Sequence, residues 1–289
     1  MVEAVLSMIG IGGFVGVGLG LAAKKFAVEV DPKVAAINEA LPASNCGGCG
    51  FPGCGQFAEA IARGEAPVNG CVAGGDKITS MLAAIMGVEA SAADKMVAVV
   101  FCKGGDDLAR KKFDYDGIYD CKAAHAMGGA GKSCMHSCVG LGTCAKVCPF
   151  DAIDMSPDRL PVVDEEKCTG CRQCEINCPR FTIRVIPAKQ KVHIRCNSID
   201  KGALTKKNCD VGCIACNKCV KTCPIGAITM VDNLARIDPK ICDGCQQCVS
   251  VCPSNTIECY IPGALKTAAD YPKPEKSTKD DEAAEAEAA

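Results

Sequence analysis

Large aromatic side chains are scarce in this chain of 289 residues, which has no Trp, 4 Tyr and 8 Phe. So few large apolar side chains leave a thin hydrophobic core for the length, and domains with thin cores usually depend on covalent or metal cross-links. The chain has 25 Cys, which can supply such links. We therefore expect folding to depend on what these cysteines bind.

Nucleotide-binding motifs are also missing. There is no Gly-x4-Gly-Lys-Ser/Thr loop and no convincing dinucleotide fingerprint after an expected strand, so nothing indicates nicotinamide or flavin binding. The histidines His125, His136 and His193 are scattered, and only His136, between two cysteines, is a candidate metal ligand. We expect no catalytic residue of this chain's own beyond electron transfer.

Cysteine runs that end in Cys-Pro occur four times. Three keep the strict Cys-x2-Cys-x2-Cys-x3-Cys-Pro spacing of bacterial ferredoxins, which bind [4Fe-4S] clusters. The strict runs are Cys168, Cys171, Cys174 and Cys178; Cys213, Cys216, Cys219 and Cys223; and Cys242, Cys245, Cys248 and Cys252. The pattern indicates an electron carrier. Disulfides are disfavoured by the Cys-Pro endings and by the absence of a cleavable signal.

The fourth cysteine of a run is expected to bind the cluster of the partner run, as in two-cluster ferredoxins. A tight loop can place three thiolates on one cluster, so the fourth thiolate has to come from elsewhere. The last two runs then form two ligand sets: Cys213, Cys216, Cys219 and Cys252, and Cys242, Cys245, Cys248 and Cys223.

The first run departs from the strict pattern, because Leu141 occupies the position of its second cysteine. Cys134 is the nearest upstream substitute. The expected sets here are Cys134, Cys138, Cys144 and Cys178, and Cys168, Cys171, Cys174 and Cys148. Ligation by Cys121 instead of Cys134, or a three-iron cluster, stays open.

A fifth array lies near the N-terminus and consists of Cys46, Cys49, Cys54 and Cys71. Intervening glycines let the backbone wrap closely around a ligand, and the spacing of Phe57 and Ile61 indicates a helix behind the loop. Four thiolates could also hold zinc. Beside four ferredoxin-type runs, we favour a [4Fe-4S] cluster.

Five cysteines remain: Cys102, Cys121, Cys196, Cys209 and Cys259. The stretch from VAVVFC to CPFDAIDM is echoed, in shorter form, from KVHIRC to CPIGAITM, which pairs Cys102 with Cys196 and Cys134 with Cys209. The first four could form a sixth cluster, with buried structural cysteine as the alternative. Cys259 has no companion and is expected to be structural.

Residues 4–23 carry no charge. About 20 residues at about 1.5 Å each can cross a hydrocarbon layer of about 30 Å, which predicts one transmembrane helix. A signal peptide is the alternative, but Glu3 precedes the stretch and Lys24 and Lys25 follow it. The positive-inside rule then places the soluble part on the cytoplasmic side of the cell membrane.

The expected fold class is α+β, divided into five segments. They are a transmembrane anchor at 1–27, a [4Fe-4S] module with a helix at 28–90, two-cluster ferredoxin-like units at 91–190 and 191–262, and a disordered acidic tail at 263–289.

The formal net charge of −2 counts every cysteine as neutral. Bound as thiolates to five oxidised clusters, the cysteines would bring the charge to about −12. Nucleic acid is therefore not an expected partner.

The order of these parts resembles the B subunit of the Rnf complex, the ion-translocating ferredoxin:NAD+ oxidoreductase of bacterial membranes. A glycine-rich span, the module Cys46-Gly-Gly-Cys49-Gly-Phe-Pro-Gly-Cys54 and the ferredoxin runs carry the resemblance, over residues 1 to about 262. It implies that electrons pass from reduced ferredoxin to membrane partners bearing flavins, that NAD+ is reduced on another subunit, and that Na+ or H+ is moved.

Two other classes of protein compete with this interpretation. A polyferredoxin-type iron–sulfur subunit of a hydrogenase or dehydrogenase complex would give no reason for the Cys46 module beside a membrane span. A cysteine-rich scaffold that stores metal would not explain the Cys-Pro endings.

Overall fold

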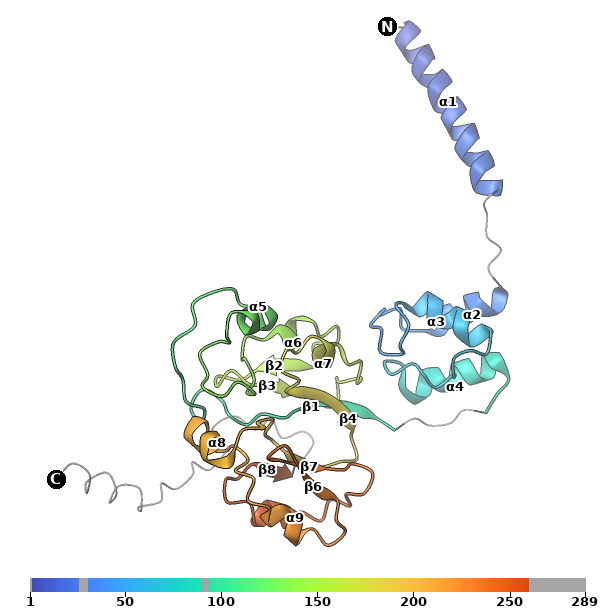
Figure 1. The fold of residues 1–289 in the computed structure, drawn as a ribbon. Coiled ribbons are helices and arrows are strands. Elements are labelled where there is room, and N and C mark those ends of the chain that lie inside the picture. The colour runs from blue at the N-terminus through green and yellow to red at the C-terminus, as the bar shows by residue number, and fades with distance from the viewer. Residues whose placement is uncertain (1, 26–30, 90–93, 260–289) are drawn as a thin grey trace, which may run out of the picture.

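The computed structural model describes residues 2–25, 31–89 and 94–259. They form an N-terminal helix, a helical module at 31–89, a first mixed unit at 94–187 and a second mixed unit at 192–259 (Figure 1). Mixed helix and strand content was expected from the sequence. The acidic tail lies outside the described residues.

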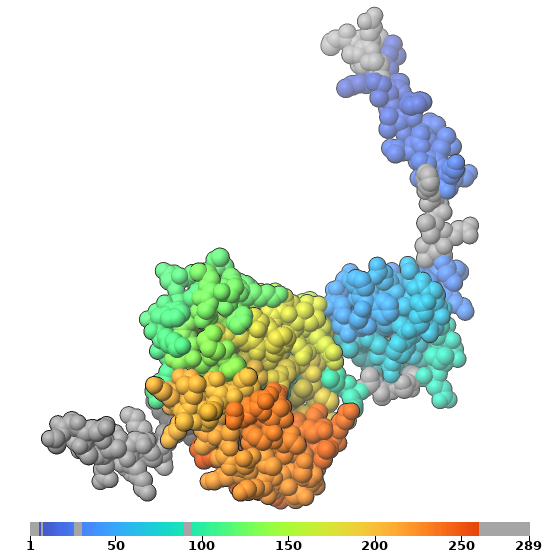
Figure 2. All heavy atoms as spheres, in the orientation of Figure 1, coloured from blue at the N-terminus to red at the C-terminus, as the bar shows by residue number. Residues whose placement is uncertain are grey.

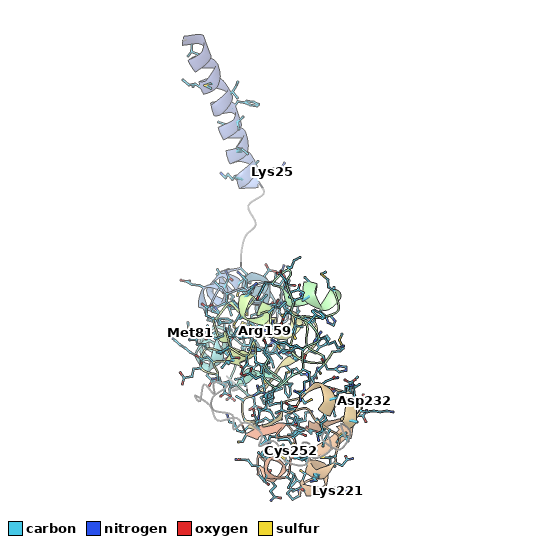
Figure 3. All side chains as sticks on the ribbon, turned by 90° about the vertical axis from the view of Figure 1, so that its left-hand side faces the viewer. Lys25, Met81, Arg159, Lys221, Asp232 and Cys252 are labelled. Atoms are coloured by element: carbon cyan, nitrogen blue, oxygen red, sulfur yellow. The ribbon has the colours of Figure 1, made fainter. Side chains whose placement is uncertain are left out.

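Helix α1 (Val2–Lys25) stands apart from the rest of the chain (Figure 1). Its stretch Met8–Lys25 has a mean hydropathy of 1.3 and is long and apolar enough to cross a membrane, and none of it is buried within the protein. Lys25 ends the helix on the side of the folded body (Figure 3). An apolar helix that no described part of the chain covers suits a lipid environment better than water.

The helical module contains α2 (Pro32–Ala40), α3 (Cys54–Ala62) and α4 (Gly75–Met86). Asp31 caps α2 by accepting a hydrogen bond from the backbone N–H of Lys33, with a proline in the first turn. The buried core contains Ile37, Phe57, Ile61 and Leu82. The helix expected behind the cysteine loop is α3, and it begins at Cys54.

The first mixed unit has two antiparallel strand pairs. Strand β1 (Met96–Val100) pairs with β4 (Ile183–Pro187), and β2 (Ile153–Met155) pairs with β3 (Pro161–Val163). The short helices are α5 (Cys121–Ala126), α6 (Thr143–Lys146) and α7 (Gln173–Ile176). Among the described residues, its main core cluster combines aliphatic side chains with cysteines and includes no aromatic ring, which agrees with the composition.

The second mixed unit repeats this plan. Strand β5 (Val192–Ile194) pairs with β8 (Ile257–Cys259), and β6 (Ile228–Val231) pairs with β7 (Leu234–Ile237). The helices are α8 (Gly202–Asn208), α9 (Lys218–Thr222) and α10 (Gln247–Ser250). Asn233, between β6 and β7, has a φ of 62°, a conformation that Asn tolerates in turns.

Equivalent backbone hydrogen bonds occur in the two mixed units, as the internal repeat predicts. The N–H of Phe101, just after β1, donates to the carbonyl of Thr182 at 2.6 Å, and the N–H of Arg195, just after β5, donates to Thr256 at 2.8 Å. Both units therefore end their first strand in the same way. This matters because a cysteine follows each of these two positions.

Candidate metal centres

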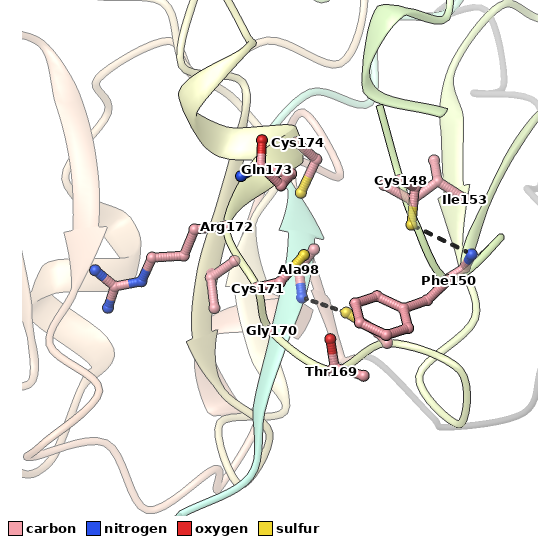
Figure 4. Close-up of a pocket in the computed structure, with 13 residues that line it drawn as sticks. Ala98, Cys148, Phe150, Ile153, Thr169, Gly170, Cys171, Arg172, Gln173 and Cys174 are labelled. Carbon is pink, nitrogen blue, oxygen red and sulfur yellow. Dashed lines mark hydrogen bonds between the residues drawn. The ribbon is translucent and has the colours of Figure 1, made fainter. Parts of the chain in front are cut away.

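The cavity in Figure 4 is lined by cysteines of two different runs, and we call it the Cys168 centre. Its cysteines are Cys148, Cys168, Cys171 and Cys174. The N–H of Ala98 donates to Cys168 Sγ and that of Ala152 to Cys148 Sγ, both at 3.4 Å (Figure 4). Such donors stabilise thiolates and bound clusters. The structure brings together the four residues that the ligand-exchange rule grouped.

Two cysteine groups occur in the second mixed unit. The Cys213 centre is a cavity lined by Cys213, Cys216, Cys219 and Cys252, and the N–H of Thr256 donates to Cys252 Sγ at 3.4 Å. The Cys242 centre comprises Cys223, Cys242, Cys245 and Cys248. Burial raises the pKa of Cys248 to about 11, and negative charge on the other three sulfurs adds to the rise. Both groups match the sequence-based sets.

The Cys46 centre is a cavity in the helical module, lined by Cys46, Cys49, Cys54 and Cys71. The side chain of Asn45 accepts a hydrogen bond from the N–H of Cys54 at 2.8 Å, which fixes the loop against α3. The module packs against the first mixed unit (Figure 2). A Cβ on Gly48, between Cys46 and Cys49, would lie 3.0 Å from the Cα of Cys171, so the two centres are close.

The remaining cavity of the first mixed unit, the Cys144 centre, differs from the sequence-based assignment. It is lined by Cys121, Cys138, Cys144 and Cys178. Cys134 is not among its lining residues. Burial raises the pKa of Cys144 to about 12, and charges on Cys121 and Cys178 add to the rise. The structure therefore favours the alternative, Cys121, over Cys134 at this position.

A hydrogen bond between two segments that lie 22 residues apart fixes the position of Cys121. Cys121 is the first residue of α5, and its N–H donates to the hydroxyl of Thr143 at 2.7 Å, beside Cys144. That hydroxyl donates in turn to Asp120 at 2.9 Å. Leu141, which replaces the missing cysteine, packs in the same apolar cluster as Cys121. The sequence offered no signal for this contact beyond the extra residues of the first repeat.

These sites fit [4Fe-4S] clusters in the arrangement of their donors. Each of the four cysteine-lined cavities is surrounded by four cysteines, and backbone N–H groups donate to several of their sulfur atoms. Within the described residues, no three Cys, His, Asp or Glu side chains converge as ligands of a single ion would. Four cysteine sulfurs with nearby backbone N–H donors suit a [4Fe-4S] cluster.

The histidines stay outside the four cysteine-lined cavities. His136 Nε2 lies 3.5 Å from Asp200 Oδ1, His125 Nδ1 accepts from Arg180 at 3.3 Å, and His193 is buried in β5. The suspicion that His136 is a ligand finds no support in this placement. Cys259 lies in β8, paired with Val192.

Arg180 carries a buried positive charge between the cysteine groups. Its Nη1 donates to the carbonyl oxygens of Cys134 at 3.3 Å and Ser137 at 3.0 Å, and no described residue accepts a hydrogen bond from the buried Nη2. Within the described residues, Arg180 forms no ion pair with a carboxylate. Burial lowers its pKa, whereas negative charge on Cys134 and Cys138 opposes this. A buried cation requires nearby negative charge, which cluster thiolates would supply.

Comparison with known proteins places the chain in a family. Residues 133–182 and 212–256 match the 4Fe-4S dicluster domain, and residues 41–73 match a putative Fe-S cluster family. The chain is 44% identical to the B subunit of the Na+-translocating ferredoxin:NAD+ oxidoreductase complex of Acetobacterium woodii, over 84% of this chain and 74% of the relative. The chain belongs to this B-subunit family.

Two further relatives agree. The B subunit of an ion-translocating oxidoreductase complex from Methanosarcina acetivorans is 40% identical over 84% of this chain and 92% of its own. The B subunit of the proton-translocating complex from Clostridium ljungdahlii is 40% identical, with 84% and 85% covered. The Rnf resemblance is thus confirmed. As a B subunit, the chain is an iron–sulfur electron-transfer component of a multi-subunit, membrane-associated complex, with α1 as its candidate membrane helix.

Proposed function

We propose that this B subunit accepts electrons from reduced ferredoxin and relays them through five [4Fe-4S] centres towards flavin-bearing membrane subunits. The observation that carries the proposal is the grouping of cysteines from different runs around shared cavities, in a member of this family. When bound, such clusters accept and release one electron at a time at low potential. NAD+ reduction and the transport of Na+ or H+ take place on other subunits.

The proposed ligand sets keep the sequence-based assignments except at one position, where Cys121 replaces Cys134. They are Cys46, Cys49, Cys54 and Cys71; Cys121, Cys138, Cys144 and Cys178; Cys148, Cys168, Cys171 and Cys174; Cys213, Cys216, Cys219 and Cys252; and Cys223, Cys242, Cys245 and Cys248. Each mixed unit then acts as a two-cluster ferredoxin-like domain, which the match of both units to the 4Fe-4S dicluster domain supports.

The chain holds neighbouring centres close together, which supports a relay. Gln173 in α7 donates to the carbonyl of Cys46 at 2.7 Å and so ties the helical module to the Cys168 centre. Cys174 and Cys144 pack in the same core cluster, so the Cys168 and Cys144 centres are also adjacent. Each of these contacts holds two centres at a fixed separation, so electron transfer between them needs no diffusive encounter.

Helix α1 is proposed to anchor this relay in the membrane with the folded units on the cytoplasmic side. Lys24 and Lys25 end the helix next to the folded body, and positive charges favour the cytoplasmic end of a span. Residues 1–27 would then be the anchor, and the folded remainder would stay beside its membrane partners. Cluster assembly also requires the reducing conditions of the cytoplasm.

Anaerobic mixing of the isolated subunit with electron donors tests the proposal. Reduced ferredoxin should bleach the broad visible absorbance of the clusters within the mixing time. NADH should leave the absorbance unchanged, because the sequence lacks a nucleotide-binding motif. Rapid reduction by NADH without partner subunits, or no reduction by ferredoxin, would overturn the assignment.

A further inference from the structure

Cys102 and Cys196 lie at the junction of the two mixed units. Cys102 follows β1, and Cys196 follows β5. The N–H of Lys103 donates to the carbonyl of Arg195 at 3.0 Å, so the ends of the two strands run side by side. The two cysteines that the internal repeat pairs are therefore brought together from separate units.

Cys134 and Cys209 reach the same junction through Arg110. The N–H of Arg110 donates to the carbonyl of Asn208 at 2.9 Å, and its carbonyl accepts from the N–H of Ser133 at 2.7 Å. Asn208 directly precedes Cys209, and Ser133 directly precedes Cys134. One residue thus holds the two cysteine-bearing segments next to each other.

Two sulfur atoms of this group lie beside Gly104. A Cβ on Gly104 would lie 3.0 Å from Cys209 Sγ and 3.9 Å from Cys102 Sγ, so both sulfurs flank that glycine. Burial raises the pKa of Cys209 to about 12, with contributions from charge on Cys102 and Cys134. Burial also raises the pKa of Cys196 to about 12, again with a contribution from Cys102. Each thiol is therefore within electrostatic reach of another member of the group.

Backbone donors link this group to a centre on each side. The N–H of Cys138 donates to Cys102 Sγ at 3.3 Å, and the N–H of Cys213 donates to Cys196 Sγ at 3.3 Å. Cys138 lines the Cys144 centre and Cys213 lines the Cys213 centre. The two hydrogen bonds are equivalent in the repeat. They place the group between the two units' proposed clusters.

A buried cation accompanies the group as well. The side chain of Lys132 is 1% exposed and lies 3.7 Å from Asp106 Oδ1. Its Nζ donates to the carbonyl of Gly104, the residue that the two sulfurs flank, at 3.0 Å. Arg180 contacts the carbonyl of Cys134. These positive charges can offset the net charge of about −2 that four thiolates and an oxidised cubane would place in a buried site.

We propose that Cys102, Cys134, Cys196 and Cys209 bind a sixth [4Fe-4S] cluster that connects the two mixed units. Cys134 replaces Cys121 in the set suggested by the sequence. When bound, this cluster would take one electron from the neighbouring centre on one side and would pass it to the centre on the other. No bond, proton or further reactant is involved. Its place in a relay rests on the proposed function, whereas its metal content does not.

Metal analysis of the anaerobically purified full chain tests the site. The wild type should hold about twenty-four irons, and Cys196→Ala/Cys209→Ala should hold about twenty, because two thiolates cannot retain the cluster. The matched control Cys259→Ala should keep the wild-type iron. A wild-type content of about twenty irons, unchanged in the double variant, would overturn the proposal.

A conservative variant covers the case in which the double variant fails to fold. Cys209→Ser offers an oxygen ligand, and we expect it to alter the potential and the electron paramagnetic resonance (EPR) signal of one cluster while the others keep theirs. A full set of unaltered signals in Cys209→Ser would contradict the site.

The connecting role has its own readout. Without the sixth cluster, the two mixed units are no longer connected. Ferredoxin should then rapidly reduce only the clusters on the side where it binds, while dithionite still reduces all of them. Rapid reduction of every cluster in Cys196→Ala/Cys209→Ala would remove the connecting role. If the wild type holds about twenty-four irons but ferredoxin does not reduce it, the proposed function is refuted and the metal site is still supported.

Discussion

The side-chain amide of Gln173 donates a hydrogen bond to the backbone carbonyl of Cys46 at 2.7 Å. The two residues are far apart in sequence, and their contact joins the loop of the helical module to α7 of the first mixed unit. Gly48, on the same loop, approaches the backbone of Cys171. The Cys46 and Cys168 centres thus share a tightly packed boundary.

Replacement of Gly48 should open this boundary. A Cβ there would lie 2.5 Å from Val72 Cγ2 and 3.0 Å from the Cα of Cys171, and overpacking of this kind costs about 1–3 kcal/mol. We expect Gly48→Val to retain its iron but to weaken the magnetic coupling between the two reduced clusters in EPR spectra. Gly55→Ala, whose Cβ meets nothing within 4 Å, is the control. Unchanged coupling in Gly48→Val would show that the contact of Gly48 with Cys171 does not determine the distance between the two clusters.

The Cys144 centre should depend on Cys121. Cys121→Ala leaves three thiolates around the cavity, and we expect loss of about one iron and a three-iron EPR signal. Adding Leu141→Cys restores the strict spacing and should restore the fourth iron, since Leu141 packs beside Cys121. Cys134→Ala should leave this centre intact. Loss of the Cys144 centre in Cys134→Ala, but not in Cys121→Ala, would reinstate the sequence-based assignment.

Arg180 should raise the reduction potential of the clusters beside it. A buried positive charge favours the reduced state, which carries one more negative charge. Arg180→Gln is expected to lower the midpoint potential of at least one cluster by on the order of 50 mV at an effective dielectric constant of about 20, as measured by EPR-monitored titration. Arg180→Lys retains the positive charge and should shift the midpoint potential less. Equal potentials in all three proteins would exclude an electrostatic role.

The stability of the second mixed unit should fall as the pH drops below about 6.5. Burial, aided by the charges of Arg195 and Lys191, lowers the pKa of His193 to about 4. The folded state therefore favours neutral His193, and stability that is present above the unfolded pKa is lost on acidification. The loss should be about 2 kcal/mol by about pH 5.

His193→Gln is the matched variant for this effect, because it keeps a polar side chain that does not titrate in this range. The rate of cluster bleaching in denaturant, compared at about pH 7.5 and about pH 5, measures the loss. Acid lability of the clusters themselves affects both proteins equally. The same pH dependence in both would rule out His193 as its source.

Removal of residues 1–25 should release the protein from membranes with its clusters retained. Helix α1 is the only described helix that reaches spanning length and hydropathy, and the described part of the body makes its cores without it. The measurement is the iron content of the soluble fraction after membranes without partner subunits are washed. A truncated protein that still sediments with them would reveal a second membrane contact.

Local motifs in the sequence were sufficient to predict most of the candidate ligands. In a strict run, three cysteines sit on one short loop, so their spacing alone brings them together, as around the Cys168 and Cys213 centres. The fourth ligand could be predicted from the exchange rule because the two runs of a pair fold on one another. The long apolar helix and the helix after the Cys46 loop follow from local patterns in the same way.

Tertiary structure decided the positions that depend on segments far apart in the chain. The sequence distance from Leu141 favours Cys134 as the substitute ligand, but the hydrogen bond from Cys121 to Thr143 brings α5 to the cavity instead. Cys134 lies instead at the junction of the two mixed units, where the strand ends at Cys102 and Cys196 are side by side. Composition and spacing indicate which ligands one loop can supply, whereas long-range backbone hydrogen bonds determine which loops come together.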